Sequence, residues 1–117
     1  MKTNSENRLR QYTARYAQAK RALQDIGFIA LGSVQTRYKT CGQPGCACQN
    51  DADKRHGPYY HWTRKVAGKT VSVTLTEEES DLYRKAIANS RKLDRLINIL
   101  QKISTRALAT AAGRKLP

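Results

Sequence analysis

The sequence is short of acidic residues, and it lacks any long run of apolar ones. Nine Asp and Glu stand against 22 Lys and Arg among 117 residues, which gives a formal net charge of +13 and a pI near 10.1. No stretch approaches the roughly 18 consecutive apolar residues of a membrane span. The first ten residues, MKTNSENRLR, also lack the apolar core of a signal peptide. We therefore expect a cytoplasmic protein with no membrane contact.

Cysteine is also scarce, because the chain has only three cysteines and all lie within eight residues. An odd number so closely spaced excludes an ordinary disulfide framework and favours thiols or metal ligands in a reducing compartment. No glycine-rich stretch carries the Gly-Lys-Ser/Thr pattern of a phosphate-binding loop. The acids at Glu77–Asp81 are better explained as the start of a helix than as a catalytic metal site. We expect no independent catalytic activity.

The length of the chain suits one domain, residues 1–117, and the fold class that we expect is α+β. Apolar residues make up 39% and the mean hydropathy is −0.70, which predicts a modest core and some apolar surface left for a partner chain. The expected order is a helix over 3–27, strands around a cysteine-rich loop over 31–76, a long helix over 77–111, and a frayed tail over 112–117.

The expected N-terminal helix has local signals at both ends. Thr3 and Glu6 have the spacing of a capping box, and Gly27 suits the position that ends a helix. Apolar residues recur at steps of three and four, a narrow seam that favours lengthwise packing on another helix. These residues are Leu9, Tyr12, Tyr16, Ala19, Leu23 and Ile26.

The middle of the chain alternates apolar and polar residues, which predicts a small antiparallel sheet of about three strands. A hairpin turn centred on Ala67 and Gly68 would pair Trp62 with Val73 and Tyr60 with Leu75, and these four residues would form a core cluster. A further strand is expected over 34–40. The opposite face would then be polar and open to solvent; it would carry Gln35, Arg37, Lys39, Tyr59, His61, Thr63, Lys65, Thr70, Ser72 and Thr74.

The expected C-terminal helix begins with a second capping box, formed by Thr76 and Glu79. At about 1.5 Å per residue it would be roughly 50 Å long, and its distal half needs the first helix or a second subunit. We expect the two helical seams to pack within one chain, with a homodimer as the alternative. The seam of this helix comprises Leu93, Leu96, Leu100, Ile103 and Ala107, with Ile97 and Leu108 beside it.

The cysteine loop is the best candidate for a chemical site. Cys41, Cys46, Cys48 and His56 match a Cys₃His zinc centre in ligand type and number. A bound Zn²⁺ would supply order to a loop that has little apolar content. The spacing contains none of the common Cys-x₂-Cys pairs, so a metal-free loop of packed thiols and a redox role stay open. His61 is the alternative fourth ligand, although strand alternation places it on the open face of the sheet.

The same stretch resembles an uncharacterised family of small basic prokaryotic proteins. The resemblance rests on Cys41-Gly42-Gln43-Pro44-Gly45-Cys46-Ala47-Cys48, a short polar stretch, His56-Gly57-Pro58-Tyr59-Tyr60 and Gly68-Lys69-Thr70. It covers about Leu31 to Leu100 and leaves the N-terminal seam outside. Genes of that family often neighbour transposase genes, so the resemblance implies, by association, a nucleic-acid-linked role beside a transposase-like or other protein partner.

The charge leads to our main functional expectation, an accessory protein that binds DNA or RNA with low sequence specificity. The resemblance implies in addition that it belongs to a mobile element or phage. The residues expected to contact nucleic acid are Arg37, Lys39, Tyr59, His61, Lys65, Lys69, Arg84, Lys85, Arg91, Lys92 and Arg95. The alternative is an oligomerising adaptor that binds a protein partner through its helical seams, its charge serving solubility or an acidic target.

Overall fold

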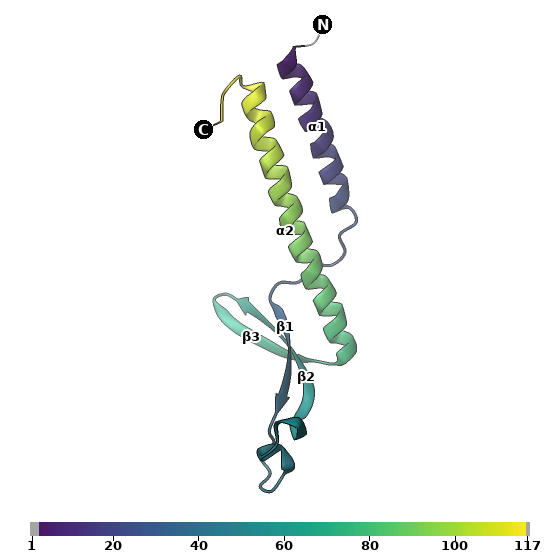
Figure 1. Cartoon of the computed structure of the whole chain (residues 1–117), viewed down its shortest axis with the longest axis vertical. Helices are drawn as coiled ribbons and strands as arrows, with labels where there is room; N and C mark the ends of the chain where they lie inside the picture. The colour runs from purple at the N-terminus through teal and green to yellow at the C-terminus, as the bar shows by residue number, and fades with distance from the viewer. Residues whose placement is uncertain (1–2, 117) are drawn as a thin grey trace. The chain divides into compact units, whose positions relative to one another are not determined.

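The computed structural model describes residues 3–116, and its elements confirm the expected α+β class (Figure 1). In chain order they are α1 (Asn4–Leu23), β1 (Ser33–Lys39), the single-turn helices η1 (Ala47–Gln49) and η2 (Ala52–Lys54), β2 (His56–Val66), β3 (Lys69–Leu75) and α2 (Glu77–Ala111). The chain forms two compact units. A sheet unit comprises Ala30–Ala88, and a helical unit comprises the residues up to Ile29 together with those from Asn89 onward.

The sheet has the strand order β1-β2-β3, and both pairings are antiparallel. The register places Trp62 between Val34 on β1 and Val73 on β3, and it pairs Tyr60 with Leu75. This confirms the predicted hairpin and the predicted additional strand. Alternation of the side chains then puts these five residues on one face and the polar residues on the other.

The turn between β2 and β3 consists of Ala67 and Gly68, with φ angles of 51° and 80°. Two central residues of positive φ define the type I′ turn, whose twist matches that of the flanking strands. Gly68 adopts this conformation freely, whereas the Cβ of Ala67 makes it unfavourable by about 1 kcal/mol. The hairpin is therefore fixed by its strand pattern in spite of a weak turn sequence.

The first turns of α2 cover the Trp62 face of the sheet. The ring centres of Trp62 and Tyr83 lie 4.5 Å apart, and the indole Nε1 donates to the Leu31 carbonyl at 2.8 Å. Leu75 and Ile87 are buried. Burial also raises the pKa of the Tyr60 phenol above its usual value, and nearby Glu77 adds to the effect. The hydrophobic core of this unit is therefore small and centred on Trp62.

Val73 does not join this core as predicted, because 41% of its surface is exposed. It lies on the edge strand β3, whereas Tyr83 meets Trp62 on β2 and Arg84 donates to Thr36 on β1 at 2.9 Å. The helix thus covers the other two strands at this level of the sheet.

Both capping boxes form as predicted. The Glu79 amide donates to Thr76 Oγ1 at 3.1 Å, and the Thr76 amide donates to Glu79 Oε1 at 3.0 Å. Thr3 and Glu6 make the same reciprocal pair at the start of α1. Local side-chain chemistry therefore fixes where both helices begin.

The end of α1 was predicted wrongly, since the helix ends at Leu23 and Gly27 does not cap it. Asn89 of α2 donates from Nδ2 to the Phe28 carbonyl at 2.9 Å, and a Cβ on Gly27 would lie 3.2 Å from the same Nδ2. Gly27 therefore serves the close approach of the connecting segment to α2.

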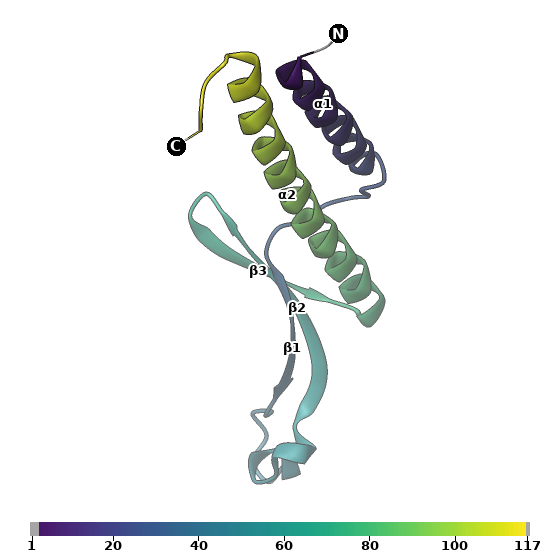
Figure 2. The same ribbon diagram turned by 45° about the horizontal axis from the view of Figure 1, so that its top comes forward.

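In the helical unit α1 runs antiparallel to the distal part of α2 (Figure 2). The two helices contact each other within one chain along the predicted seams, but the seams are only half-buried. No described residue of α1 is fully buried, and Ile97, Ile99 and Leu108 of α2 are 41%, 45% and 68% exposed. A two-helix layer thus leaves much of its apolar surface in water.

The segment after α2, which we expected to be frayed, ends the helix in a defined turn. Gly113 has a φ of 67°, its amide donates to the Thr110 carbonyl at 3.2 Å, and the Arg114 amide donates to the Ala109 carbonyl at 2.8 Å. These bonds are those of a Schellman motif. No helix within residues 3–116 is both long and apolar enough to cross a bilayer.

Candidate metal centre and nucleic-acid interface

The four residues predicted as metal ligands come together in the loop between β1 and β2. Cys41 follows β1, Cys46 precedes η1, Cys48 lies in η1, and His56 is the first residue of β2. One ligand atom from each lies within 4.8 Å of all the others. Three separate segments of the chain thus converge on a Cys₃His cluster that could hold a metal ion.

Two distances within the cluster match the edges of a zinc tetrahedron, and all four ligand atoms lie within 4.8 Å of one another. Cys41 Sγ lies 3.5 Å from Cys48 Sγ, and Cys46 Sγ lies 3.5 Å from His56 Nε2. Zinc bonds of about 2.3 Å to sulfur and 2.0–2.1 Å to nitrogen give tetrahedron edges of about 3.5–3.8 Å. The donor set of three soft thiolates and an imidazole is also one that zinc prefers.

The backbone of the loop supports this arrangement. Gly45 has a φ of 82°, which lets the chain turn sharply just before Cys46. The Cys41 amide donates to Cys48 Sγ at 3.3 Å, and the Gln49 side-chain amide donates to the Cys41 carbonyl. Such bonds orient sulfur ligands around a metal.

The thiols differ in how readily they ionise. A hydrogen bond from the backbone of Cys48 lowers the pKa of the Cys46 thiol below its ordinary value. For Cys48 the Cys41 backbone amide also favours the thiolate, but burial and the two neighbouring thiols together raise its pKa. A bound cation would remove that cost, because a coordinating thiol is deprotonated by the metal.

His61 is not part of the cluster. It pairs with Gln35 on β1 and Thr74 on β3 in the middle of the sheet. We expected a surface side chain, but His61 is half-buried, and its Nε2 is buried without a hydrogen-bond partner among residues 3–116. Its central position between two strands accounts for the burial.

The polar residues of the strands share the face opposite Trp62, as predicted. Arg37 pairs with Tyr59 in the register, and its guanidinium donates to Gln35 Oε1 through Nε at 3.1 Å. Lys39 Nζ lies 5.6 Å from the centre of the Tyr59 ring. This open face therefore carries a cluster of two cations and one aromatic ring, with Lys65 farther along β2.

The other predicted contacts lie elsewhere. The register puts Lys69, at the hairpin turn, opposite Val66 and on the Trp62 side of the sheet. Arg84 is engaged with Thr36 on the covered face. Lys85 is exposed on the first part of α2. Arg91, Lys92 and Arg95 are exposed on α2 and belong to the helical unit.

Two features that bear on the candidate interface were not predicted. The role of Gln35 in holding Arg37 depends on rotamers, which the sequence does not specify. The second feature is the uneven distribution of charge between the two units. It follows from counting charged residues, but only when the residues of each unit are known. Thirteen Lys and Arg stand against three Asp and Glu in the helical unit, a formal charge of +10, whereas nine stand against six in the sheet unit, a charge of +3.

The chain matches the family model described as a domain of unknown function (DUF6788) over residues 4–85. It belongs to this family. The match begins at the start of α1, so our expectation that the N-terminal helix lies outside the resemblance was wrong. No match to a curated protein or to a solved structure was found. The family description names no activity, ligand or partner.

Proposed function

We propose that the protein binds nucleic acid through the open face of its sheet and that a zinc ion holds the cysteine loop beside it. The observation that carries the proposal is a cluster on the open face. The register aligns Arg37 and Lys65 with Tyr59, and Lys39, which follows a shift in the register, has its Nζ 5.6 Å from the centre of the Tyr59 ring. None of the three strands contains Asp or Glu, so no carboxylate on the strands opposes these cations.

The composition of this face predicts how it would bind. Contacts of Lys and Arg to phosphates carry no information about the base sequence, so binding through them has a salt-dependent affinity and a weak sequence preference. Tyr59 is 41% exposed and offers a ring on which an unpaired base can stack. The face is therefore better suited to single-stranded nucleic acid than to groove recognition, for which the described residues provide no helix-turn-helix.

Zinc would act structurally in this proposal. Cys41 directly follows Lys39–Thr40, and His56 begins the strand that carries Tyr59. Coordination would therefore tie together the ends of β1 and β2 at the edge of the proposed interface.

The test is fluorescence anisotropy with labelled single-stranded DNA, duplex DNA and RNA over a salt series. Replacing Arg37, Lys39 and Lys65 by Glu should weaken single-strand binding by more than about tenfold. A control that replaces Arg10, Lys20 and Arg21 by Glu makes the same change in net charge in the helical unit. Equal losses for the two triple variants would show attraction by net charge alone, and a loss only in the control would place the nucleic-acid site on the helices; either outcome would contradict the proposal.

A further inference from the structure

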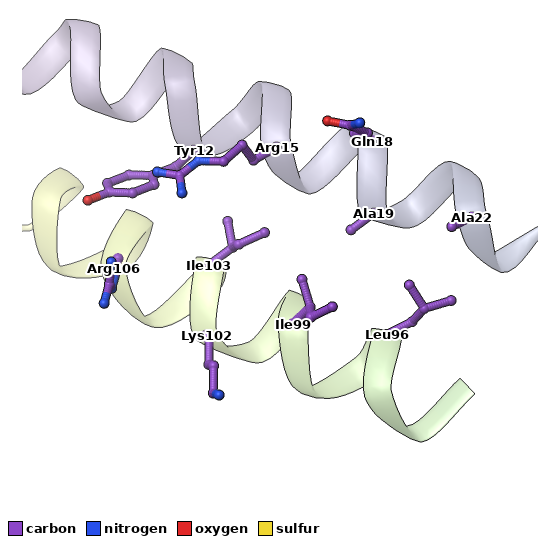
Figure 3. A pocket seen from close by; sticks show the side chains of 10 residues that line it. All are labelled: Tyr12, Arg15, Gln18, Ala19, Ala22, Leu96, Ile99, Lys102, Ile103 and Arg106. Carbon is purple, nitrogen blue, oxygen red and sulfur yellow. The ribbon is translucent and has the colours of Figure 1, made fainter. Parts of the chain in front are cut away.

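An open groove of about 560 Å³ runs between α1 and α2 in the helical unit (Figure 3). Its floor is apolar, and Ile99 and Ile103 point from α2 toward α1. Ile99 remains 45% exposed although it faces the neighbouring helix. The floor consists of Ala19, Ala22, Leu96, Ile99 and Ile103. The small side chains of α1 leave room between the helices for side chains from outside.

The edge of the groove is cationic. It is lined by Arg15, Lys102 and Arg106, and the Arg15 guanidinium lies 5.2 Å from the centre of the Tyr12 ring. Tyr12 and Arg106 also line a second cleft toward the helix ends, which the turn at Gly113 closes with Arg114 and Lys115. No Asp or Glu is among the described residues that line either cavity.

We infer that this groove binds an acidic amphipathic helix of a partner protein. A third helix laid along two antiparallel helices buries its apolar stripe on their shared floor, which is the geometry of a helical bundle. Carboxylates flanking that stripe would meet Arg15, Lys102 and Arg106. The groove extends from Tyr12 to Ala22 on α1, so it accommodates about three turns of helix.

Charge and apolar surface together favour this occupant over two others. A nucleic acid would neutralise the cations but would leave the floor of Leu96, Ile99 and Ile103 exposed to water. A second copy of the chain would cover the floor but would bring two units of charge +10 together. An acidic helix satisfies both features of the groove. This inference is independent of the proposed nucleic-acid interface, which lies on the sheet unit.

The test uses a synthetic peptide of about three heptads, with Leu and Ile at the a and d positions and Glu at most others. Its binding to the full chain is measured by anisotropy at about 0.15 M salt. A scrambled peptide of the same composition and charge is the peptide control. We expect the amphipathic peptide to bind at least about tenfold more tightly than the scrambled one, which corresponds to about 1.4 kcal/mol.

Two pairs of matched variants locate the site. Ile99→Glu should weaken peptide binding at least about tenfold. Ile97 is similarly exposed on the same helix but does not line the groove, so Ile97→Glu should change peptide binding by less than about twofold. Arg15→Glu should weaken binding more than Lys20→Glu, a residue of α1 outside the groove. Circular dichroism checks that each variant is folded, and the Arg15 pair decides the question if Ile99→Glu unfolds.

Three results would overturn the inference. Equal binding of the scrambled peptide would show attraction by charge alone. A wild-type dimer in sedimentation that Ile99→Glu converts to a monomer would make a second copy the occupant. Loss of oligonucleotide binding in Ile99→Glu, with competition between oligonucleotide and peptide, would make nucleic acid the occupant. By contrast, the variant with Glu at positions 37, 39 and 65 should bind the peptide as the wild type does, even if the nucleic-acid proposal fails.

Discussion

The Nζ atom of Lys39 lies 5.6 Å from the centre of the Tyr59 ring, and Arg37, which pairs with Tyr59 in the register, is held by Gln35. The ring is thus flanked by cations on the neighbouring strand while 41% of its surface stays exposed. A base that stacks on Tyr59 would place its phosphates near Arg37 and Lys39. Binding of this kind would couple stacking to charge neutralisation at one position.

Tyr59→Ala should therefore weaken single-stranded DNA binding by about 1–3 kcal/mol, because one stacking platform is lost. Duplex binding should change much less, since paired bases are not free to stack. Tyr38→Ala is the matched control, because Tyr38 is 57% exposed on β1 but its phenol lies near Tyr60 on the other side of the sheet. Anisotropy with both substrates measures the difference. Similar losses for the two variants would argue against stacking on Tyr59.

If the Cys₃His cluster holds zinc as proposed, native mass spectrometry should show one zinc ion per chain. Cys48→Ser should abolish zinc retention during dialysis, because it removes a buried ligand of the cluster. His61→Gln should keep the metal, since His61 lies in the middle of the sheet. Gly42→Ala should also keep it, because a Cβ there meets no atom within 4 Å. Zinc loss in His61→Gln, with retention in His56→Gln, would instead support the alternative ligand.

Gly32 should be the glycine least tolerant of substitution in the sheet unit. Its φ is 94°, and a Cβ there would lie 2.1 Å from the Thr63 carbonyl oxygen on β2. Gly32→Ala should lower the free energy of unfolding by more than about 2 kcal/mol, because either the strand pairing or the backbone must shift. Urea unfolding measures this effect. Gly42→Ala, at an open position, should change stability by less than about 0.5 kcal/mol.

At the hairpin turn, by contrast, a substitution should stabilise the protein. Ala67 adopts a φ of 51°, which Asn tolerates better than Ala does. Ala67→Asn should therefore raise the free energy of unfolding by about 0.5–1 kcal/mol. Ala67→Val, with a β-branched side chain at positive φ, should lower it. A destabilising effect of Asn would show that the turn is held by contacts other than its own conformation.

The sequence predicted those features that depend on neighbours along the chain. Thr76 and Glu79 are three residues apart, so their capping box can be recognised without knowledge of the fold. The register of Trp62 with Val73 likewise follows from alternation and one turn. The ligand set from Cys41 to His56 was recognisable because its residue types have few other uses at such density.

The features that were missed depend on contacts between distant segments. Gly27 lies beside Asn89, and this close approach has no local signature. The exposure of Val73 and the half-burial of His61 depend on where α2 lies and on which strand is central. The turn at Gly113 is different, because a glycine after a long helix is a recognisable local signal for the end of the helix, and the prediction of a frayed tail did not use it.

Thr76 is the only residue between the end of β3 at Leu75 and the start of α2 at Glu77, and its side chain caps the helix. This single connecting residue therefore fixes which face of α2 is turned toward the sheet. An extra residue inserted there would turn the covering face of α2 by about 100° and would separate Tyr83 from Trp62. The same insertion at the open hairpin tip beside Gly68 would have no such partner to displace. We therefore expect the protein to tolerate inserted residues at the hairpin tip and not at the junction between β3 and α2.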